Sequence, residues 1–240
     1  MSEHTRIAMW SGPRTRSTAM LRAWENRPDT SVVDEPLYAY YLANTDVPDP
    51  GQEEVIASQP TDWRTVLDAL TTAPPPAGAP IFYQKHLAQH LLPAVDRSLL
   101  RPLRHAFLIR HPAEMLASYA QVQAPSADEL GLRQQYELHR LFGGPVVDTS
   151  DLVERPEPVL RELCRALDVP FTPQMLSWPA GPRPTDGVWG RHWYKGVWNS
   201  TGFSPSASPV HPLPDHLHPV LDECLPFYQE LRSIRISGQE

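Results

Sequence analysis

Short apolar runs alternate with stretches of helical periodicity along this chain. The apolar runs indicate buried strands at residues 6–10, 31–34, 81–85, 105–109 and 145–148. Apolar residues at helical spacing predict helices at residues 17–26, 63–71, 112–123, 156–167 and 213–233. Strands that alternate with crossover helices are typical of a parallel sheet covered on both faces. The pattern therefore predicts an α/β fold, a three-layer sandwich with a central parallel sheet.

The length of the chain fits a single domain. Its 240 residues, of which 41% are hydrophobic, are enough to bury one large α/β core, so we expect one domain over residues 1–240. One segment, residues 178–212, is rich in glycine, proline and tryptophan and shows no period. An irregular segment of this length inside a compact domain is usually functional.

The net charge and the length of the apolar runs argue against two kinds of binding partner, nucleic acid and membrane. A net charge of −7 argues against nucleic acid, which binds to basic surfaces. No run approaches the length of a membrane span, and the N-terminus lacks the pattern of a signal peptide, so we expect a cytoplasmic protein without membrane contact. Cys164 and Cys224 lie on apolar faces of predicted helices and are expected to be buried thiols, although the sequence leaves one disulfide open. The sequence does not decide between a monomer and a homodimer.

A polar loop, Ser11-Gly-Pro-Arg-Thr-Arg-Ser-Thr18, joins the first predicted strand to its helix. The first N–H groups of a helix have no partner within it and point at one spot, with the positive end of the helix dipole behind them. This geometry binds phosphate or sulfate. Arg14 and Arg16 add positive charge, and Ser17 and Thr18 add hydroxyl donors. The loop is not a Walker A motif, and the alternative is an ordinary turn with two surface arginines.

A second candidate anion site follows the fourth predicted strand. Arg110 comes directly after this strand, and Ser118 lies two turns into the next helix. Because ligands of doubly wound sheets lie beyond the carboxyl ends of the strands, we expect both side chains to meet one anion. The alternative for Arg110 is a salt bridge.

Together these segments resemble the PAPS-dependent sulfotransferases, bacterial members included, which use 3′-phosphoadenosine-5′-phosphosulfate (PAPS). The loop at residues 11–18 is similar to their 5′-phosphosulfate loop, and Arg110-His-Pro followed by Ser118 is similar to their 3′-phosphate motif. Residues 85–93 resemble the segment with the family's catalytic histidine, and residues 194–196 resemble the loop that closes on the 3′-phosphate. The resemblance implies a P-loop-like sulfotransferase architecture. It assigns binding of PAPS to Gly12, Pro13, Arg14, Thr15, Arg16, Ser17, Thr18, Arg110, Ser118, Lys195 and Gly196.

The chain departs from the family pattern at several positions. Arg14 stands where the well-studied members carry lysine, and Arg16 stands where they carry glycine. Arginine keeps its charge and suits anions, so we expect Arg14 to stabilise the oxygen that bridges phosphate and sulfur, although its guanidinium is a poor general acid. Ala19 replaces an aromatic residue that would stack on adenine, and no arginine precedes Lys195.

Two residues are candidates for the base that removes a proton from the acceptor. His86 lies in the family-like segment, and imidazole titrates near neutrality. Glu35 follows the second predicted strand at the same carboxyl edge, and it resembles the glutamate base of some bacterial sulfotransferases. We rank His86 ahead of Glu35. The alternatives are that His86 caps a helix and that Glu35 pairs with Arg14 or Arg16.

The sequence thus predicts a transferase that moves a sulfuryl group from PAPS to a hydroxyl or amine of a small-molecule acceptor and leaves 3′,5′-ADP. Arginines and helix N–H groups neutralise charge in this scheme, so we expect no metal. One alternative is an ATP-dependent small-molecule kinase in which Asp34 or Glu35 holds Mg²⁺. Another is a catalytically inactive nucleotide-binding or scaffold protein, suggested by arginine in place of lysine at residue 14.

Overall fold

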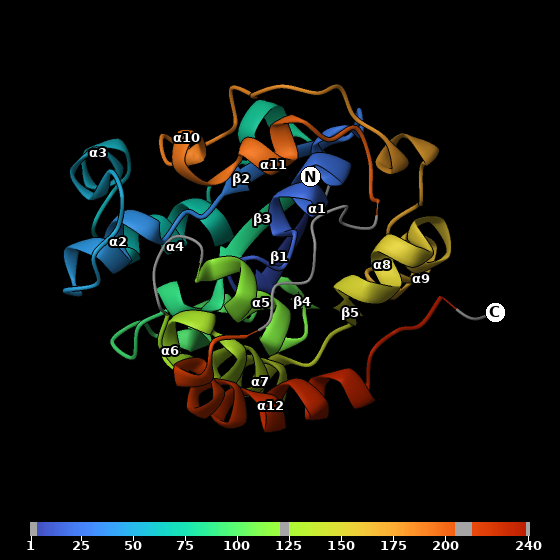
Figure 1. Ribbon diagram of the computed structural model, residues 1–240. Helices are drawn as coiled ribbons and strands as arrows, with labels where there is room; N and C mark the ends of the chain where they lie inside the picture. The colour runs from blue at the N-terminus through green and yellow to red at the C-terminus, as the bar shows by residue number, and fades with distance from the viewer. Residues whose placement is uncertain (1–3, 121–124, 205–212, 239–240) are drawn as a thin grey trace.

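The computed structural model of the protein describes residues 4–120, 125–204 and 213–238, and its centre is a five-stranded sheet (Figure 1). The order of the strands is β2-β3-β1-β4-β5, and every neighbouring pair is parallel. The strands are β1 Thr5–Ser11, β2 Thr30–Asp34, β3 Ile81–Leu87, β4 Arg104–Ile109 and β5 Val146–Asp148. Each predicted strand is therefore present, with small shifts at its ends.

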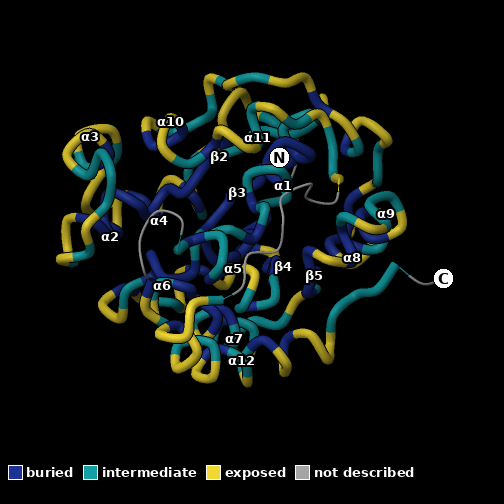
Figure 2. Tube along the Cα trace, viewed as in Figure 1, coloured by how far each residue is buried: buried dark blue, intermediate teal, exposed yellow. Residues whose placement is uncertain are grey.

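The middle of the sheet is fully buried, as its apolar sequence predicted. The residues from Ile7 to Trp10 of β1 are 0% exposed, and Figure 2 shows the strands as part of the dark interior. Strand β1 pairs with β3 on one side and with β4 on the other. Its last residue, Ser11, lies beside Leu87 of β3 and Leu108 of β4. The loops that follow these three strands therefore leave the sheet at the same edge.

Helices cover both faces of this sheet. The α-helices among the described residues are α1 Ser17–Glu25, α2 Tyr38–Ala43, α3 Gln52–Ser58, α4 Trp63–Thr71, α5 Pro112–Tyr119, α6 Ala127–Leu130, α7 Leu132–Phe142, α8 Thr149–Glu154, α9 Pro156–Ala166, α10 Gly190–Trp193, α11 Lys195–Trp198 and α12 His218–Ser233. Helices α1 and α9 pack on one face, and α4, α5, α7 and α12 pack on the other. The predicted three-layer α/β sandwich is confirmed.

Two predicted helices are shorter than their sequence patterns by more than one residue. The helix expected at residues 112–123 ends at Tyr119, and residues 121–124 lie outside the described part of the chain. The helix expected at residues 213–233 begins as a 3₁₀ turn at Asp215 and becomes α-helical at His218. Both cysteines are buried free thiols.

The segment expected to be irregular contains the short helices α10 and α11. Trp189 and Tyr194 of this segment join Tyr38 of α2 in a third apolar cluster, which fixes the segment against the carboxyl edge of the sheet. Residues 205–212 of the same predicted loop lie outside the described part of the chain. No helix among the described residues combines the length and the hydropathy needed to cross a membrane.

Candidate functional site

The loop after β1 is held in one conformation by its own side chains and by close packing. The Thr15 hydroxyl donates to the Gly12 carbonyl at 2.8 Å, and the Thr149 hydroxyl donates to the Thr15 carbonyl at 2.9 Å. Gly12 leaves no room for a side chain, because a Cβ atom there would lie 2.2 Å from the Leu130 carbonyl oxygen. Arg14 has a φ angle of 62°, a left-handed value that is unfavourable outside glycine. The packing around the loop maintains this strained backbone.

The N-terminus of α1 presents unpaired N–H groups at the end of this loop. Its first backbone hydrogen bond runs from Met20 N to Arg16 O at 3.1 Å, so the N–H groups of residues 17–19 have no helical acceptor. Arg16 occupies the position before the helix and places no side-chain cap on it. Unpaired N–H groups backed by the helix dipole favour an anion at this end of α1.

The two predicted anion segments meet at the carboxyl edge of the sheet. Arg14 Nε donates to the Ser118 hydroxyl oxygen at 2.9 Å, and Arg110 Nη1 donates to the Arg14 carbonyl at 2.7 Å. Arg110 also pairs through Nε with Glu114 at 2.9 Å, so the salt bridge weighed as its alternative role is present as well. The pairing of β1 with β4 explains the meeting, because it sets the loops after these strands side by side.

Positive charge in this group of side chains is only partly compensated. Burial, and next the nearby Arg110 guanidinium, lower the pKa of Arg14 below its usual value. The same two causes, in the same order, lower the pKa of Arg16. Both guanidinium groups remain charged at neutral pH, since arginine titrates far above it. An anion bound between them would relieve the repulsion.

A buried ion network lies at the same edge, where β2 and β3 end. Lys85 is 1% exposed, and its ammonium contacts Asp34 Oδ1 at 2.8 Å, a Glu35 carboxylate oxygen and the Tyr194 hydroxyl at 3.0 Å. Tyr194 donates to Asp34 Oδ2 at 2.5 Å and accepts from Trp189 Nε1 at 2.8 Å. The alternative role for Glu35, a pair with Arg14 or Arg16, is not present, because Glu35 Oε1 pairs with Lys85 instead.

The pKa of Glu35 lies near neutrality in this network. Burial raises its pKa to about 7, while the Lys85 ammonium opposes the rise. Its second oxygen, Oε2, forms no hydrogen bond with the described residues. The backbone at Glu35 has a φ angle of 42°, another strained left-handed value. Strain of this kind is common where a side chain must be held in a particular direction.

His86 does not lie where the sequence placed it. The expectation was that the strand ends at Lys85 and that the imidazole then points at the reacting group, but β3 continues to Leu87. The His86 ring is therefore a core side chain, 1% exposed and stacked on Trp10 with 4.4 Å between ring centroids. Burial lowers its pKa to about 3. Alternation along an extended strand sends neighbouring residues to opposite faces, so Lys85 and His86 separate.

The remaining predicted residues divide into two groups. Pro13 and Ser17 are buried in the loop, and Thr18 is half-buried at the start of α1. Lys195 and Gly196 are exposed on α11, and no contact joins Lys195 to Arg110 or Ser118 among the described interactions. Their part in binding a 3′-phosphate stays a prediction.

Sequence reasoning did not assign a role to the side chains of Lys85 and Tyr194. Lys85 is one of two lysines in the chain and sits at the end of an apolar run, which is a signal for a buried, paired charge. Tyr194 carries no comparable signal, because it lies 160 residues from its partner Asp34. Only the fold brings the two together.

Comparison with known proteins bears on the family and the fold of this chain. A family model described as "Sulfotransferase domain" matches residues 5–235. The sulfotransferase domain from the Synechococcus PCC 7002 olefin synthase aligns over 93% of this chain and 96% of its own, with a TM-score of 0.53 and 16% identity. A sulfotransferase from Alicyclobacillus acidocaldarius aligns over 98% of both chains, with a TM-score of 0.56 and 12% identity. At these identities the two structures support the fold alone.

Two relatives from Arabidopsis thaliana are more similar in sequence and carry another kind of name. The proteins named "Branched-chain-amino-acid aminotransferase-like protein 1" and "protein 2" are 37% and 34% identical over 97% and 94% of this chain. The chain spans only 42% and 41% of the length of these relatives. Their names therefore describe proteins more than twice as long as the matched region.

Proposed function

This chain belongs to the sulfotransferase domain family, and we propose that it transfers a sulfuryl group from PAPS to a hydroxyl or amine of a small-molecule acceptor. One observation carries the proposal: Arg14, Ser118 and Arg110 are joined by hydrogen bonds at the open N-terminus of α1. Two segments predicted to bind anions, with Arg14 and Ser118 104 residues apart in sequence, thus lie together and form one cationic surface. PAPS carries anionic groups at its 5′ and 3′ positions, which such a surface suits.

The residues of this surface keep unused hydrogen-bond donors. Arg14 uses Nε on Ser118, and its two terminal amino groups have no acceptor among the described residues. Arg16 donates through Nη1 to the Ser204 carbonyl at 2.8 Å and has a second terminal amino group to offer. Guanidinium groups form strong, often bidentate hydrogen bonds with phosphate and sulfate oxygens. The donor set therefore fits a phosphosulfate group.

When bound, PAPS supplies the sulfuryl group, whose bond to the 5′-phosphate oxygen breaks as the acceptor oxygen or nitrogen bonds to sulfur. Arg14 and the N–H groups of α1 stabilise the negative charge that develops on the departing phosphate. Their positions are set by the loop before reaction, so little reorganisation is needed. No protonation of the departing phosphate by Arg14 is required.

Glu35 is the base that we propose for the acceptor proton. Its pKa of about 7 leaves a useful fraction ionised at neutral pH, and its unpartnered Oε2 is the atom that takes the proton. Lys85 holds the other oxygen and limits the rotation of the carboxylate. His86 is the weaker candidate, because a core imidazole with a pKa of about 3 accepts a proton poorly.

The kinase alternative is not supported by the arrangement of the carboxylates. It requires Asp34 or Glu35 to hold Mg²⁺, but the Lys85 ammonium contacts both. Mg²⁺ prefers oxygen ligands that are free to approach it, and an ammonium between two carboxylates takes the place of such an ion. Displacing the ammonium would leave it buried without a partner.

Aminotransferase chemistry, suggested by the names of the plant relatives, is also disfavoured for this chain. Such chemistry uses a lysine that forms a Schiff base, and the amine must be unprotonated to react. Lys85 is buried, yet the carboxylates of Asp34 and Glu35 outweigh its desolvation and raise its pKa. It therefore stays an ammonium. The chain's other lysine, Lys195, is exposed on α11.

Nucleotide binding without metal tests the proposed function. We expect 3′,5′-ADP to raise the unfolding temperature in the presence of EDTA, and 5′-AMP to raise it much less. At a ligand concentration of about 100 times Kd, the gain in unfolding free energy is roughly 2.7 kcal/mol. Equal stabilisation by both nucleotides, or an effect only of ATP with Mg²⁺, would contradict the proposal.

Two variants then separate the base candidates. Glu35→Gln removes the charge and keeps the shape, so we expect kcat for PAPS hydrolysis or acceptor sulfation to fall by about 10²–10⁴-fold with nucleotide affinity unchanged. His86→Ala serves as the comparison and should keep its kcat per folded molecule. The reverse pattern would restore His86 as the base.

A further inference from the structure

Two buried carboxylates share one ammonium where β2 and β3 end. Asp34 and Glu35 are consecutive in the chain and buried, and the Lys85 ammonium contacts both of them. One positive charge does not compensate two ionised carboxylates, so the pair favours the retention of one proton. Burial raises the pKa of Glu35 to about 7, and the Asp34 charge adds to the rise. Which carboxylate holds the proton depends on the other hydrogen bonds that each receives.

The hydroxyl group of Tyr194 makes the difference between the two carboxylates. It donates to Asp34 Oδ2 at 2.5 Å, and it accepts from Trp189 Nε1 at 2.8 Å and from Lys85 Nζ at 3.0 Å. A hydroxyl has one proton to donate and two lone pairs that accept, so each of these positions is used. Glu35 Oε1 lies 3.3 Å from the same oxygen and competes for the same single proton. Asp34 receives it, because its oxygen is closer.

The charged forms of the two carboxylates are therefore stabilised to different extents. Asp34 accepts at both oxygens, from Lys85 at Oδ1 and from Tyr194 at Oδ2. Glu35 accepts from Lys85 at Oε1, while its Oε2 has no partner among the described residues. Hydrogen bonds to a carboxylate favour its ionised form. The proton of the pair therefore belongs on Glu35, the residue that the proposed function uses as the base.

Tyr194 is held in place by other contacts of its segment. It forms the junction between α10 and α11, which lie beside β2 (Figure 1). Asp186 ties the segment to α1 through an ion pair with the buried Arg22, and it accepts from Trp198 Nε1 at 2.9 Å. The position of the Tyr194 hydroxyl is thus fixed by contacts outside the carboxylate pair.

Other titratable groups near the pair do not exchange a proton at neutral pH. They are Tyr38 of α2, Tyr83 and His86 of β3, and His90 in the 3₁₀ turn after β3. Burial raises the pKa of both tyrosines and lowers the pKa of both histidines. Burial also raises the pKa of Tyr194, and the carboxylates keep Lys85 protonated. A titration near pH 7 in this part of the protein therefore belongs to the two carboxylates.

We propose that Tyr194 is a positioning residue that confines the proton of this carboxylate pair to Glu35. The proposal rests on the proposed function, in which Glu35 is the base, and it gives the segment around residue 194 a part in catalysis besides the predicted contact with the 3′-phosphate. Without the hydroxyl, Asp34 Oδ2 loses its donor, and Asp34 competes with Glu35 for the proton. The pair also loses a hydrogen bond to its ionised form, so it releases its proton at higher pH.

Carbon-13 NMR of protein labelled at the aspartate and glutamate carboxyl carbons locates this proton. In wild type we expect the Glu35 signal to titrate near pH 7 and to carry most of the change in chemical shift. In Tyr194→Phe we expect the Asp34 and Glu35 signals to titrate together, about one pH unit higher, as for a lost hydrogen bond to a charged group. Glu35→Gln and Asp34→Asn assign the two signals.

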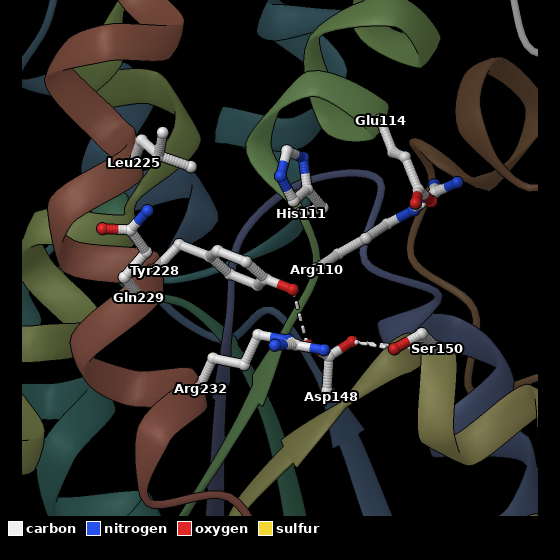
Figure 3. Close-up of a pocket in the computed structure, with 9 residues that line it drawn as sticks. All are labelled: Arg110, His111, Glu114, Asp148, Ser150, Leu225, Tyr228, Gln229 and Arg232. Carbon is white, nitrogen blue, oxygen red and sulfur yellow. Dashed lines mark hydrogen bonds and ion pairs between the residues drawn. The ribbon is translucent and has the colours of Figure 1, made fainter.

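Tyr228→Phe is the matched control. The Tyr228 hydroxyl donates at 2.8 Å to Asp148, another buried aspartate, in a cavity of about 370 Å³ between α5, β5 and α12 (Figure 3). Arg110 and Arg232 also line this cavity, and β5 lies at the opposite edge of the sheet from β2. The control removes the same kind of hydrogen bond, so it should cost similar stability and leave the titration of the carboxylate pair unchanged.

A titration that stays on Glu35 at the wild-type pH in Tyr194→Phe would overturn the proposal, and so would an equal shift in Tyr228→Phe. The NMR measurement needs neither PAPS nor an acceptor, so it does not depend on the proposed function. If wild type transferred no sulfuryl group, the proposed function would fail by itself, and the titration would still decide where Tyr194 places the proton. With an active wild type, the acidic limb of the kcat profile at saturating substrates should move up by the same amount in Tyr194→Phe. An unmoved limb would overturn the role of Tyr194 in catalysis.

Discussion

Replacing Lys85 with methionine would remove the cation from a buried network that contains two carboxylates. Methionine fills a volume similar to the lysine side chain, so the change is mainly electrostatic. In the wild-type protein the ammonium contacts Asp34, Glu35 and Tyr194. In the variant, Asp34 keeps its bond from the Tyr194 hydroxyl at 2.5 Å, whereas Glu35 loses its shortest contact. The variant therefore contains at least one uncompensated buried carboxylate.

The expected cost is large for a single substitution. Breaking a buried ion pair by removing one partner typically destabilises a protein by about 3–5 kcal/mol, because the other charge stays in a poorly solvating interior. This loss is a substantial part of the roughly 5–15 kcal/mol by which domains are stable. At pH 8 we expect Lys85→Met to lower the free energy of unfolding by about 3–5 kcal/mol.

The free energy of unfolding lost in Lys85→Met should also depend on pH. In the folded protein the pKa of Glu35 is about 7, above the ordinary 4.5, and the Lys85 charge is one of the groups that keep it from rising further. Without Lys85 the folded-state pKa rises more, so the folded variant binds a proton that the unfolded chain releases. This proton binding stabilises the folded variant at low pH, and the stabilisation disappears as pH rises through the folded pKa. The difference from wild type should therefore be smaller at pH 5 than at pH 8.

Urea unfolding at pH 5 and pH 8, followed by tryptophan fluorescence, measures both effects. Lys195→Met is the matched control, since it removes the chain's other lysine from an exposed site and should change stability by less than about 0.5 kcal/mol. Adding Glu35→Gln to Lys85→Met should restore part of the loss at pH 8 and little at pH 5. A loss under about 1 kcal/mol at pH 8, or the same loss at both pH values, would refute the reasoning.

Two further predictions concern the core and the loop. Burial lowers the pKa of His86 to about 3, so the unfolded chain binds more protons than the folded one between about pH 6.5 and 3, and stability falls as pH falls through that window. We expect His86→Phe to reduce this decline of the unfolding temperature with falling pH. An unchanged decline would contradict the burial of the ring. We expect Gly12→Ala to lower the free energy of unfolding by about 1–3 kcal/mol and to weaken nucleotide binding, because its Cβ atom would lie 2.2 Å from Leu130 O and 2.7 Å from Met115 Cε. A Cβ atom at Gly196 would have no neighbour within 4 Å, so Gly196→Ala should leave the unfolding temperature unchanged when both variants are compared by thermal unfolding.

Most of the fold could be predicted from the sequence. The strands and most of the helices that pack on them are encoded in apolar periodicity, which depends on residues close together in the chain, although α7 at Leu132–Phe142 was not predicted. The anion loop was predictable for the same reason, because a strand, a helix start and two arginines are contiguous within residues 11–18. The convergence with Arg110 followed from a general rule about the carboxyl ends of parallel strands.

The choice between the two base candidates could not be made from the sequence. It depended on where β3 ends, since a strand that continues through His86 sends this ring into the core and Lys85 toward Glu35. The end of a strand is set by pairing with its neighbours, here Trp10 and Ser11 of β1 beside His86 and Leu87. The local sequence pattern does not show how the strands pair.

The partners of the candidate site were decided by the tertiary structure alone. Tyr194 contacts Lys85, which lies 109 residues away in the sequence. Arg232 and Arg110 line one cavity although they come from elements far apart in the sequence. Neither position differs in its local sequence from an ordinary buried tyrosine or exposed helical arginine. Their surroundings arise only when separate elements pack, because burial, charge and hydrogen bonding are properties of the assembled neighbourhood and not of the segment that carries the side chain.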